Sequence, residues 1–194
     1  MKIWIPLFIY LAVQSITPGP NDLTCLYLGA TKGLRGSLRF ISGSMIMVFV
    51  KSVICGLLNI ALTDIFPGIV QWLKWIGCAY MIYLAWTMIR SGWQSGEKTI
   101  KSEGTFLSGV LLQILNAKSW IAAISAYAVY VTPISNDVKT VVFVAFAFFV
   151  IATVASLIWA AFGSGIKSFI QKHKKAFGII MGLSLLWCAY SAIV

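Results

Sequence analysis

Six apolar stretches, each about as long as the hydrocarbon core of a membrane is thick, make up most of this chain. A spanning helix needs about 20 mostly apolar residues. The stretches that qualify are 3–30, 41–63, 71–90, 105–131, 139–163 and 176–194. Short loops connect them, so we expect a single transmembrane domain over residues 1–194 and no soluble domain.

The composition supports a membrane protein over a soluble one. Of the 194 residues, 60% are hydrophobic and 10% charged, whereas soluble domains carry about 25% charged residues. The net charge of +10 would favour nucleic-acid binding in a soluble protein. Here the basic residues fall in loops between apolar stretches, which is typical of a topological signal, so we expect a lipid bilayer and no nucleic acid as partner.

The N-terminal stretch has no signal-peptide cleavage motif. The cysteines lie singly in apolar stretches, which favours packing over metal or disulfide roles.

Lysine and arginine counts predict the orientation. Ten of these residues lie in the loops after the first, third and fifth stretches, and three lie on the opposite side. Because cytoplasmic loops carry the excess of positive charge, we expect the odd loops in the cytoplasm of a bacterial inner membrane and both termini outside.

Polar residues interrupt the first and fourth stretches at similar depths. TPGPND begins 14 residues after Ile3, and Asn116-Ala117-Lys118 begins 11 residues after Thr105. With the N-terminus outside, the two halves have opposite orientations. We therefore predict an all-α integral membrane fold with six transmembrane helices in two inverted three-helix repeats, about 1–95 and 104–194. Paired interruptions of this kind indicate a midplane binding site in secondary transporters.

The first interruption has the chemistry of a binding site. Pro18 and Pro20 lack backbone donors and break the helical hydrogen bonds. Irregular backbone at membrane depth is tolerated only where it packs against protein or lines a wet cavity. A helix restarting at Pro20 would offer free N–H groups to a carboxylate. The alternative is a plain proline kink, which would not require Asn21 and Asp22.

Three charged residues lie well inside the apolar stretches, away from their ends: Asp22, Lys51 and Lys118. Asp22 is the one carboxylate that we place within a span. An ionisable residue inside a membrane span indicates a functional site by default. It could bind a substrate ammonium, carry a coupling proton, or form a structural ion pair with Lys118. Lys118 could instead attract a substrate carboxylate or extend toward the interface. Lys51 and Gln113 are candidates for cavity lining, as are Ser119 and Ser125, although such polar residues also bond between helices.

No sequence motif indicates an enzyme. The chain has no GxSxG, HExxH or GxxxxGK motif, so a catalytic nucleophile, a metal centre and direct ATP coupling are not expected. We expect no cofactor and no metal. His173 lies in the basic run QKHKK and reads as a solvated loop residue.

Four segments carry a family resemblance. ITPGPND, GATKGLRGS, WIGCAYMIYLAW and GVLLQILNAKSW resemble the lysine-exporter (LysE/RhtB) superfamily of amino-acid efflux proteins, over essentially the whole chain. The resemblance implies a substrate site at Thr17, Pro18, Gly19, Pro20 and Asn21, and at Asn116 and Lys118, which match the family's Asn-Pro-Lys. Ala117 stands where many members have proline.

The resemblance also implies export powered by the proton motive force. The sequence looks most like the branches that export threonine and homoserine, or cysteine and O-acetylserine. The second stretch holds Lys51 and no carboxylate, which favours a small neutral zwitterion over a dibasic amino acid. We therefore expect proton-coupled export with Asp22 as proton carrier. A passive channel or facilitator on the same scaffold and an accessory subunit of a larger assembly are the alternatives, and homo-oligomerisation is left open.

The topology makes a direct prediction. A reporter protein fused after Val194 should report an external location, and the same reporter inserted after Lys172 should report a cytoplasmic one, because the positive-inside rule places these sites on opposite sides. Protease accessibility in spheroplasts, which lack an intact outer membrane, measures both. A cytoplasmic C-terminus would contradict the orientation and the inverted repeat together.

Overall fold

The computed structural model describes residues 4–61, 79, 82–83, 85–86, 89–90, 104–132, 135, 137–166, 169 and 172–193. These residues form an all-helical structure without strands. The elements are α1 (Trp4–Ile16), α2 (Pro20–Ala61), α4 (Phe106–Leu115), α5 (Ala117–Ser125), the π-helix η2 (Ala126–Val131), α6 (Val138–Gly165) and α8 (Lys174–Ile193).

The expected membrane stretches are recovered in part. Among the described residues, α2 and α6 are each long and apolar enough to cross a membrane, and α4 with α5 and η2, bent by 63°, makes a third if this pair counts as one span. Helix α1 is a shorter apolar helix, and α8 covers most of the expected sixth stretch. Most of the expected third stretch, 71–90, lies outside the described residues. The described residues therefore form an all-helical fold with two or three helices able to cross a membrane, and the six-span inverted repeat stays a prediction.

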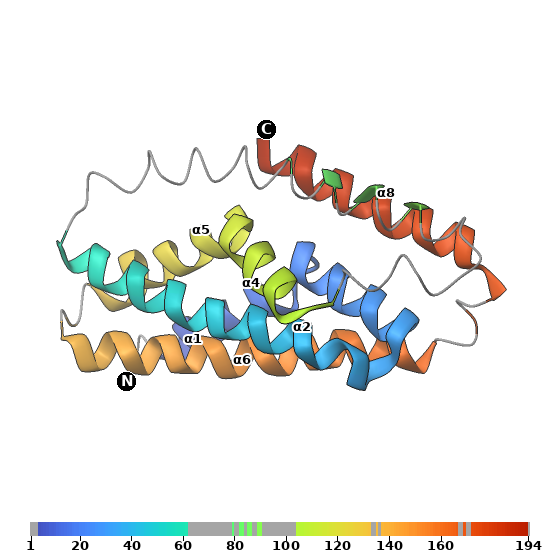
Figure 1. Ribbon diagram of the computed structural model, residues 1–194. Coiled ribbons are helices and arrows are strands. Elements are labelled where there is room, and N and C mark those ends of the chain that lie inside the picture. The colour runs from blue at the N-terminus through green and yellow to red at the C-terminus, as the bar shows by residue number, and fades with distance from the viewer. Residues whose placement is uncertain are drawn as a thin grey trace.

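The first two expected stretches meet within α2. Residues 31–40, which the sequence assigns to a loop, are helical apart from Gly33. Gly33 has φ 79° and ψ 170°, a conformation that glycine adopts readily because it has no Cβ. The two arms of α2 fold back on each other at this residue (Figure 1). The basic residues Lys32, Arg35 and Arg39 thus lie on a tight helical turn at one end of the bundle.

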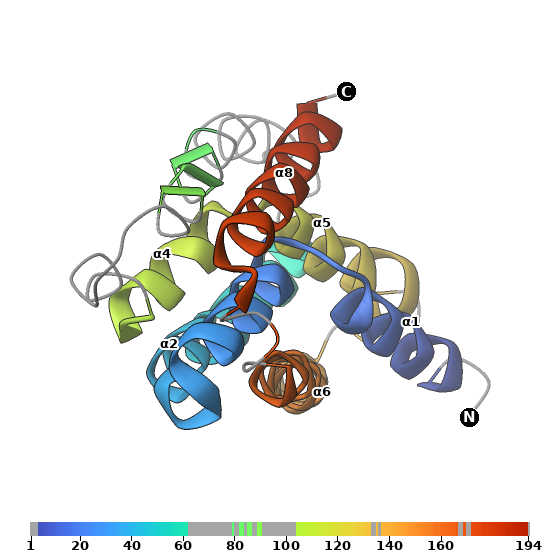
Figure 2. The same cartoon turned by 90° about the vertical axis from the view of Figure 1, so that its right-hand side faces the viewer.

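The helices pack closely where glycines remove the side chain. Helix α2 makes its most extensive contact with α6, and its next with α4. A Cβ added at Gly29 would lie 2.0 Å from the Ala160 carbonyl oxygen of α6, and one at Gly163 would lie 2.1 Å from the Leu26 carbonyl oxygen of α2. Small residues bring helix backbones together in membranes, as the Gly29-xxx-Gly33 spacing predicts at Gly29. The end-on view shows α2, α4, α5, α6 and α1 grouped around a common interior (Figure 2).

The same close approach occurs between α2 and α4. A Cβ at Gly43 would lie 2.0 Å from the Phe106 carbonyl oxygen, and one at Gly109 would lie 2.2 Å from the Phe40 carbonyl oxygen. The arm of α2 before Gly33 therefore packs closely against α6, and the arm after Gly33 packs closely against α4. This arrangement brings the start of α2 and the break between α4 and α5 into one interior.

Two glycines of α6 provide a matched test of this packing. Gly163→Ala should destabilise the protein by about 1–3 kcal/mol, the usual cost of overpacking, because its methyl group would meet the Leu26 carbonyl oxygen. Gly165→Ala should be neutral or slightly stabilising, because nothing lies within 4 Å of the added Cβ. The apparent melting temperature in detergent measures both. Equal melting temperatures for the two variants would contradict the close α2–α6 contact.

Candidate functional site

The first helix break occurs where the two prolines predict it. Helix α1 ends at Ile16 and α2 begins at Pro20. The last helical bond of α1 runs from Thr17 N to the Val13 oxygen at 2.9 Å, and the first of α2 runs from Leu23 N to the Gly19 oxygen at 2.9 Å. In a continuous helix the Asn21 N–H would bond the Thr17 carbonyl. Here the Lys118 ammonium donates a hydrogen bond to the Thr17 carbonyl instead, at 2.5 Å.

The second helix break lies at Asn116. Its φ of −82° and ψ of 92° end α4, and its side-chain oxygen accepts from Ser119 N, so Asn116 is the N-cap of α5. Asparagine is among the best N-cap residues. The helix therefore breaks although Ala117 stands where the resemblance leads us to expect proline.

Side chains satisfy the carbonyls that this second break releases. In a continuous helix Gln113 and Ile114 would accept from the backbone N–H groups of residues 117 and 118. In the structure the Lys51 ammonium donates to the Gln113 oxygen at 3.3 Å, and Trp120 Nε1 donates to the Ile114 oxygen at 2.7 Å. The Lys51 ammonium also lies 5.6 Å from the centre of the Trp120 ring, a cation–π distance. Lys51 and Trp120 thus satisfy the carbonyl groups at the end of α4.

A small polar cavity lies between the two breaks. It has a volume of about 40 Å³ and is lined by side chains from α1, the start of α2, the second arm of α2, the α4–α5 break and α6. The lining residues are Gln14, Ser15, Gly19, Asn21, Asp22, Met45, Val48, Gln113, Asn116, Lys118, Ser119, Ala122, Phe148, Ala152 and Ser156. Ligand pockets usually measure about 300–1,000 Å³. This cavity therefore has room for water and not for a whole amino acid.

Opposite charges face each other across Gly19 in this cavity. The Asp22 carboxyl group is buried, and the positive charge of Lys118 acts on it electrostatically. A Cβ at Gly19 would lie 3.1 Å from Lys118 Nζ and 3.5 Å from Asp22 Oδ2. Glycine at this position thus leaves the space into which both charged groups reach. A ligand with both a positive and a negative group matches this charge pattern.

Asn21 is held in place by three side chains. Its Oδ1 accepts from Ser44 Oγ at 2.6 Å, and its Nδ2 donates to Ser156 Oγ at 2.9 Å and to Asp22 Oδ1 at 3.4 Å. All of these groups are buried. Asn21 therefore ties the start of α2 to the second arm of α2 and to α6, and it orients Asp22.

Ser15 contributes an unpaired polar atom. Its side chain is 8% exposed and lines the cavity, and its Oγ is the buried side-chain polar atom for which the described residues provide no hydrogen-bond partner. A buried polar group without a partner costs free energy. A ligand or water in the cavity would supply that partner.

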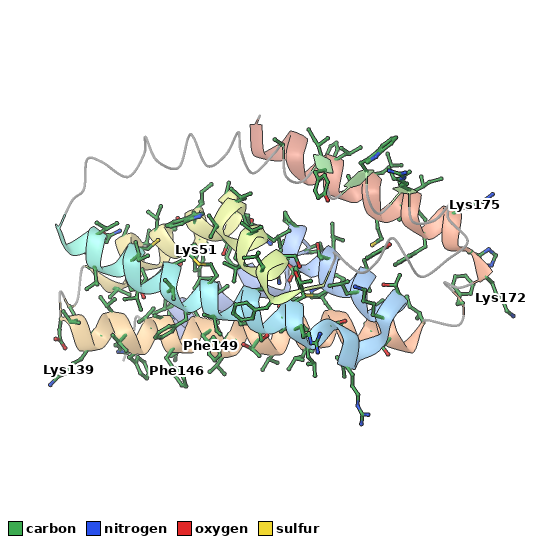
Figure 3. The ribbon with its side chains drawn as sticks, viewed as in Figure 1. Lys51, Lys139, Phe146, Phe149, Lys172 and Lys175 are labelled. Atoms are coloured by element: carbon green, nitrogen blue, oxygen red, sulfur yellow. The ribbon has the colours of Figure 1, made fainter. Side chains whose placement is uncertain are left out.

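The structure brings most of the sequence-predicted site residues together. Gly19, Asn21, Asp22, Asn116, Lys118 and Gln113 line the cavity. Thr17 and Pro18 are exposed at the break, Pro20 starts α2, and none of these three lines the cavity. Lys51 is fully buried and lies behind the cavity wall, bonded to Gln113 and Ser119. Figure 3 shows Lys51 within the bundle, whereas Lys139, Lys172 and Lys175 lie toward its ends.

Sequence reasoning missed Ser15, Ser44 and Ser156. Each is a single small polar residue in an apolar stretch, a pattern that also marks ordinary bonds between helices. Their helical positions could not be related to the breaks without the fold. Ser125, which the spacing offered as cavity lining, is not among the lining residues.

The bridge between Ser44 and Asn21 can be tested with a neighbouring serine as control. Ser44→Ala should cost about 1–3 kcal/mol, because it leaves the buried Asn21 Oδ1 without a donor. Ser42→Ala should have little effect, because Ser42 is exposed and bonds the Arg39 oxygen of its own helix. Thermal unfolding of the two purified variants compares them. A Ser44→Ala variant as stable as Ser42→Ala would contradict the bridging role of Asn21.

Comparison with known proteins adds three findings. The family model for the LysE type translocator matches residues 12–193. The chain is 28% identical over 180 residues to the cysteine/O-acetylserine efflux protein of Salmonella paratyphi A, covering 93% of this chain and 92% of that protein. It is 26% identical over 185 residues to the protein of the same name from Klebsiella pneumoniae, covering 95% and 94%. No solved structure matches the chain.

Proposed function

The chain belongs to the LysE type translocator family, and from this we propose that it is a secondary transporter that exports small neutral amino acids or their derivatives from the bacterial cytoplasm. The observation that carries the proposal is the polar cavity between two helix breaks, lined by Asp22, Lys118 and Asn116. The names of the relatives support the substrate class, since they are cysteine/O-acetylserine efflux proteins. We propose the same class here, with threonine and homoserine as further candidates.

The charge pattern of the cavity supports a zwitterionic substrate. One carboxylate and one ammonium reach the cavity near Gly19. An amino acid with a neutral side chain carries one charge of each sign at its α-carbon. In the proposed complex Asp22 binds the substrate ammonium. A dibasic substrate would bring a second cation, for which the described lining provides no second carboxylate.

The proposed mechanism is alternating access driven by proton entry. A cavity of about 40 Å³ cannot admit an amino acid without a change of conformation, which favours a gated transporter over an open pore. The two breaks come from chain segments that we propose to be inverted repeats, with three spans in each half. Rocking of one repeat against the other would open the cavity first to the cytoplasm and then outside. Asp22 would exchange substrate ammonium for a proton in that cycle.

The placement of the other charges supports this arrangement in the membrane. Lys139 at the start of α6 and Lys172 and Lys175 near the start of α8 lie toward opposite ends of the bundle (Figure 3). This agrees with their assignment to opposite sides of the membrane. The proposed orientation has Lys172 and Lys175 in the cytoplasm and both chain termini outside.

The role of Asp22 can be tested by an isosteric change. Asp22→Asn should lower proton-dependent efflux at least about tenfold, because the amide cannot carry the proton or pair with a substrate ammonium. Asp137→Asn is the control, since Asp137 is exposed before α6 and its side chain makes no capping bond. Efflux of a panel of amino acids from preloaded vesicles, with and without a pH gradient, measures both variants.

The outcomes separate the candidate functions. A passive facilitator would be supported if wild-type efflux does not depend on the pH gradient and runs only down the substrate gradient. Efflux by Asp22→Asn that keeps the wild-type rate and pH dependence would remove Asp22 from the mechanism. An absence of efflux of every amino acid by the purified wild-type protein would overturn the proposed function.

A further inference from the structure

Lys51 is a fully buried ammonium group in the middle of α2. Its hydrogen bonds go to the Gln113 carbonyl oxygen at 3.3 Å, to Gln113 Oε1 at 3.1 Å and to Ser119 Oγ. All three acceptors are uncharged. A buried charge is costly unless it is well hydrogen-bonded, and these three acceptors satisfy the three donors of the ammonium group. Two of the acceptors, the side chains of Gln113 and Ser119, line the cavity between the helix breaks.

The hydrogen-bonding chemistry of Lys51 determines which groups of Gln113 and Ser119 remain available to the cavity. A lysine ammonium has three donors and no acceptor. Gln113 must therefore turn its Oε1 toward Lys51, which directs its amide nitrogen, with two N–H donors, away from Lys51. Ser119 likewise uses an oxygen lone pair on Lys51, so its O–H hydrogen points elsewhere. Both cavity-lining residues are thus set to act as hydrogen-bond donors on the cavity side.

The backbone around these residues has the same polarity. Ser119 lies in the first turn of α5, a helix of nine residues that starts at Ala117 and is capped by Asn116. The N-terminal end of a helix carries partial positive charge. Ser15 of α1 brings to the same cavity a buried hydroxyl group for which the described residues provide no partner. This part of the cavity therefore suits an anionic group with several acceptor oxygens.

Asp22 and Lys118 both reach the space beside Gly19, but neither is free to bind the substrate carboxylate. Lys118 already donates to the Thr17 carbonyl, and its charge acts on Asp22. A carboxylate that bound Lys118 would compete with both groups. Gln113 and Ser119 have no such competing acceptor among the interactions described.

We propose that Lys51 is a positioning residue that sets Gln113 and Ser119 as a donor pair for the α-carboxylate of the exported amino acid. This rests on the proposed function and assigns the two ends of the substrate, with the ammonium on Asp22 and the carboxylate on the donor pair. Lys51 itself does not touch the substrate. It acts by preventing Gln113 from presenting its oxygen to the cavity.

Binding of two ligands that differ only at the carboxylate tests the assignment. Purified protein in detergent is titrated with L-cysteine and with L-cysteine methyl ester under reducing conditions, by calorimetry. The wild-type protein should bind the acid at least about tenfold more tightly, which is the size expected for hydrogen bonds to a charged group. Gln113→Glu keeps the shape and the acceptor for Lys51 but presents a second oxygen to the cavity. Its preference for the acid should fall to about one or reverse.

Three further variants complete the experiment. Ser119→Ala should reduce the preference for the acid by removing one donor. This variant replaces Gln113→Glu as the test if Gln113→Glu is poorly folded. Lys51→Met should reduce the same preference while the affinity for the ester changes less, because Gln113 is then free to rotate. Lys139→Met removes an exposed lysine at the start of α6 and should leave both affinities unchanged.

The ratio of the two affinities decides between the outcomes. If Gln113→Glu and Ser119→Ala both keep the wild-type ratio, the donor pair does not bind the carboxylate and the inference is wrong, while the proposed function stands. If Lys51→Met lowers both affinities equally, Lys51 is only structural. If the wild-type protein binds both ligands equally, the carboxylate subsite is absent. If it binds neither, cysteine transport itself is contradicted.

Discussion

Breaking a helix inside a membrane releases backbone carbonyls that have no water to bond, and the rest of this structure follows from how those carbonyls are satisfied. Each unsatisfied group at that depth costs several kcal/mol. Here a lysine from another segment serves each break. Lys118 of α5 bonds Thr17 at the end of α1, and Lys51 of α2 bonds Gln113 near the end of α4. In both cases a cation sits at the negative end of a helix, where the helix dipole favours it.

This exchange of lysines makes the two breaks depend on each other. The break between α1 and α2 is bonded by Lys118 of α5, and the break between α4 and α5 is bonded by Lys51 of α2. The close glycine contacts of α2 with α6 and α4 hold the segments at the distance these bonds need. The polar cavity is the space that remains between the two repaired breaks.

Much of this arrangement could be predicted from the sequence because it depends on local chemistry. Two prolines within four residues end a helix wherever they occur, and a lone carboxylate in an apolar stretch has to face protein or water. The positions of the breaks and of Asp22, Lys118 and Asn116 near a common cavity follow from such rules. The all-helical fold follows from the length of the apolar stretches.

The remaining features depend on contacts between distant segments. Basic residues around Gly33 are typical of a loop, and only the fold shows that one glycine with positive φ is enough to reverse the chain. Ser44 and Ser156 have no sequence signal beyond their polarity, since their partner Asn21 lies 23 and 135 residues away. Lys51 could be identified as unusual but not as a donor to the α4–α5 break, because 62 residues separate it from Gln113.

The bond from Lys118 to Thr17 limits how the proposed transport cycle can proceed. The cavity is too small for an amino acid, so the segments around it have to separate when the substrate enters. Separation of α5 from the first break would leave the Thr17 carbonyl and the charge of Asp22 without Lys118 at the same time. A substrate ammonium or a proton could neutralise Asp22 at that moment, and water entering the opened cavity could bond Thr17. An empty and unprotonated site would leave both uncompensated. Because that state is the costly one, the transporter would change conformation with either substrate or proton bound, which is the condition for exchanging one for the other.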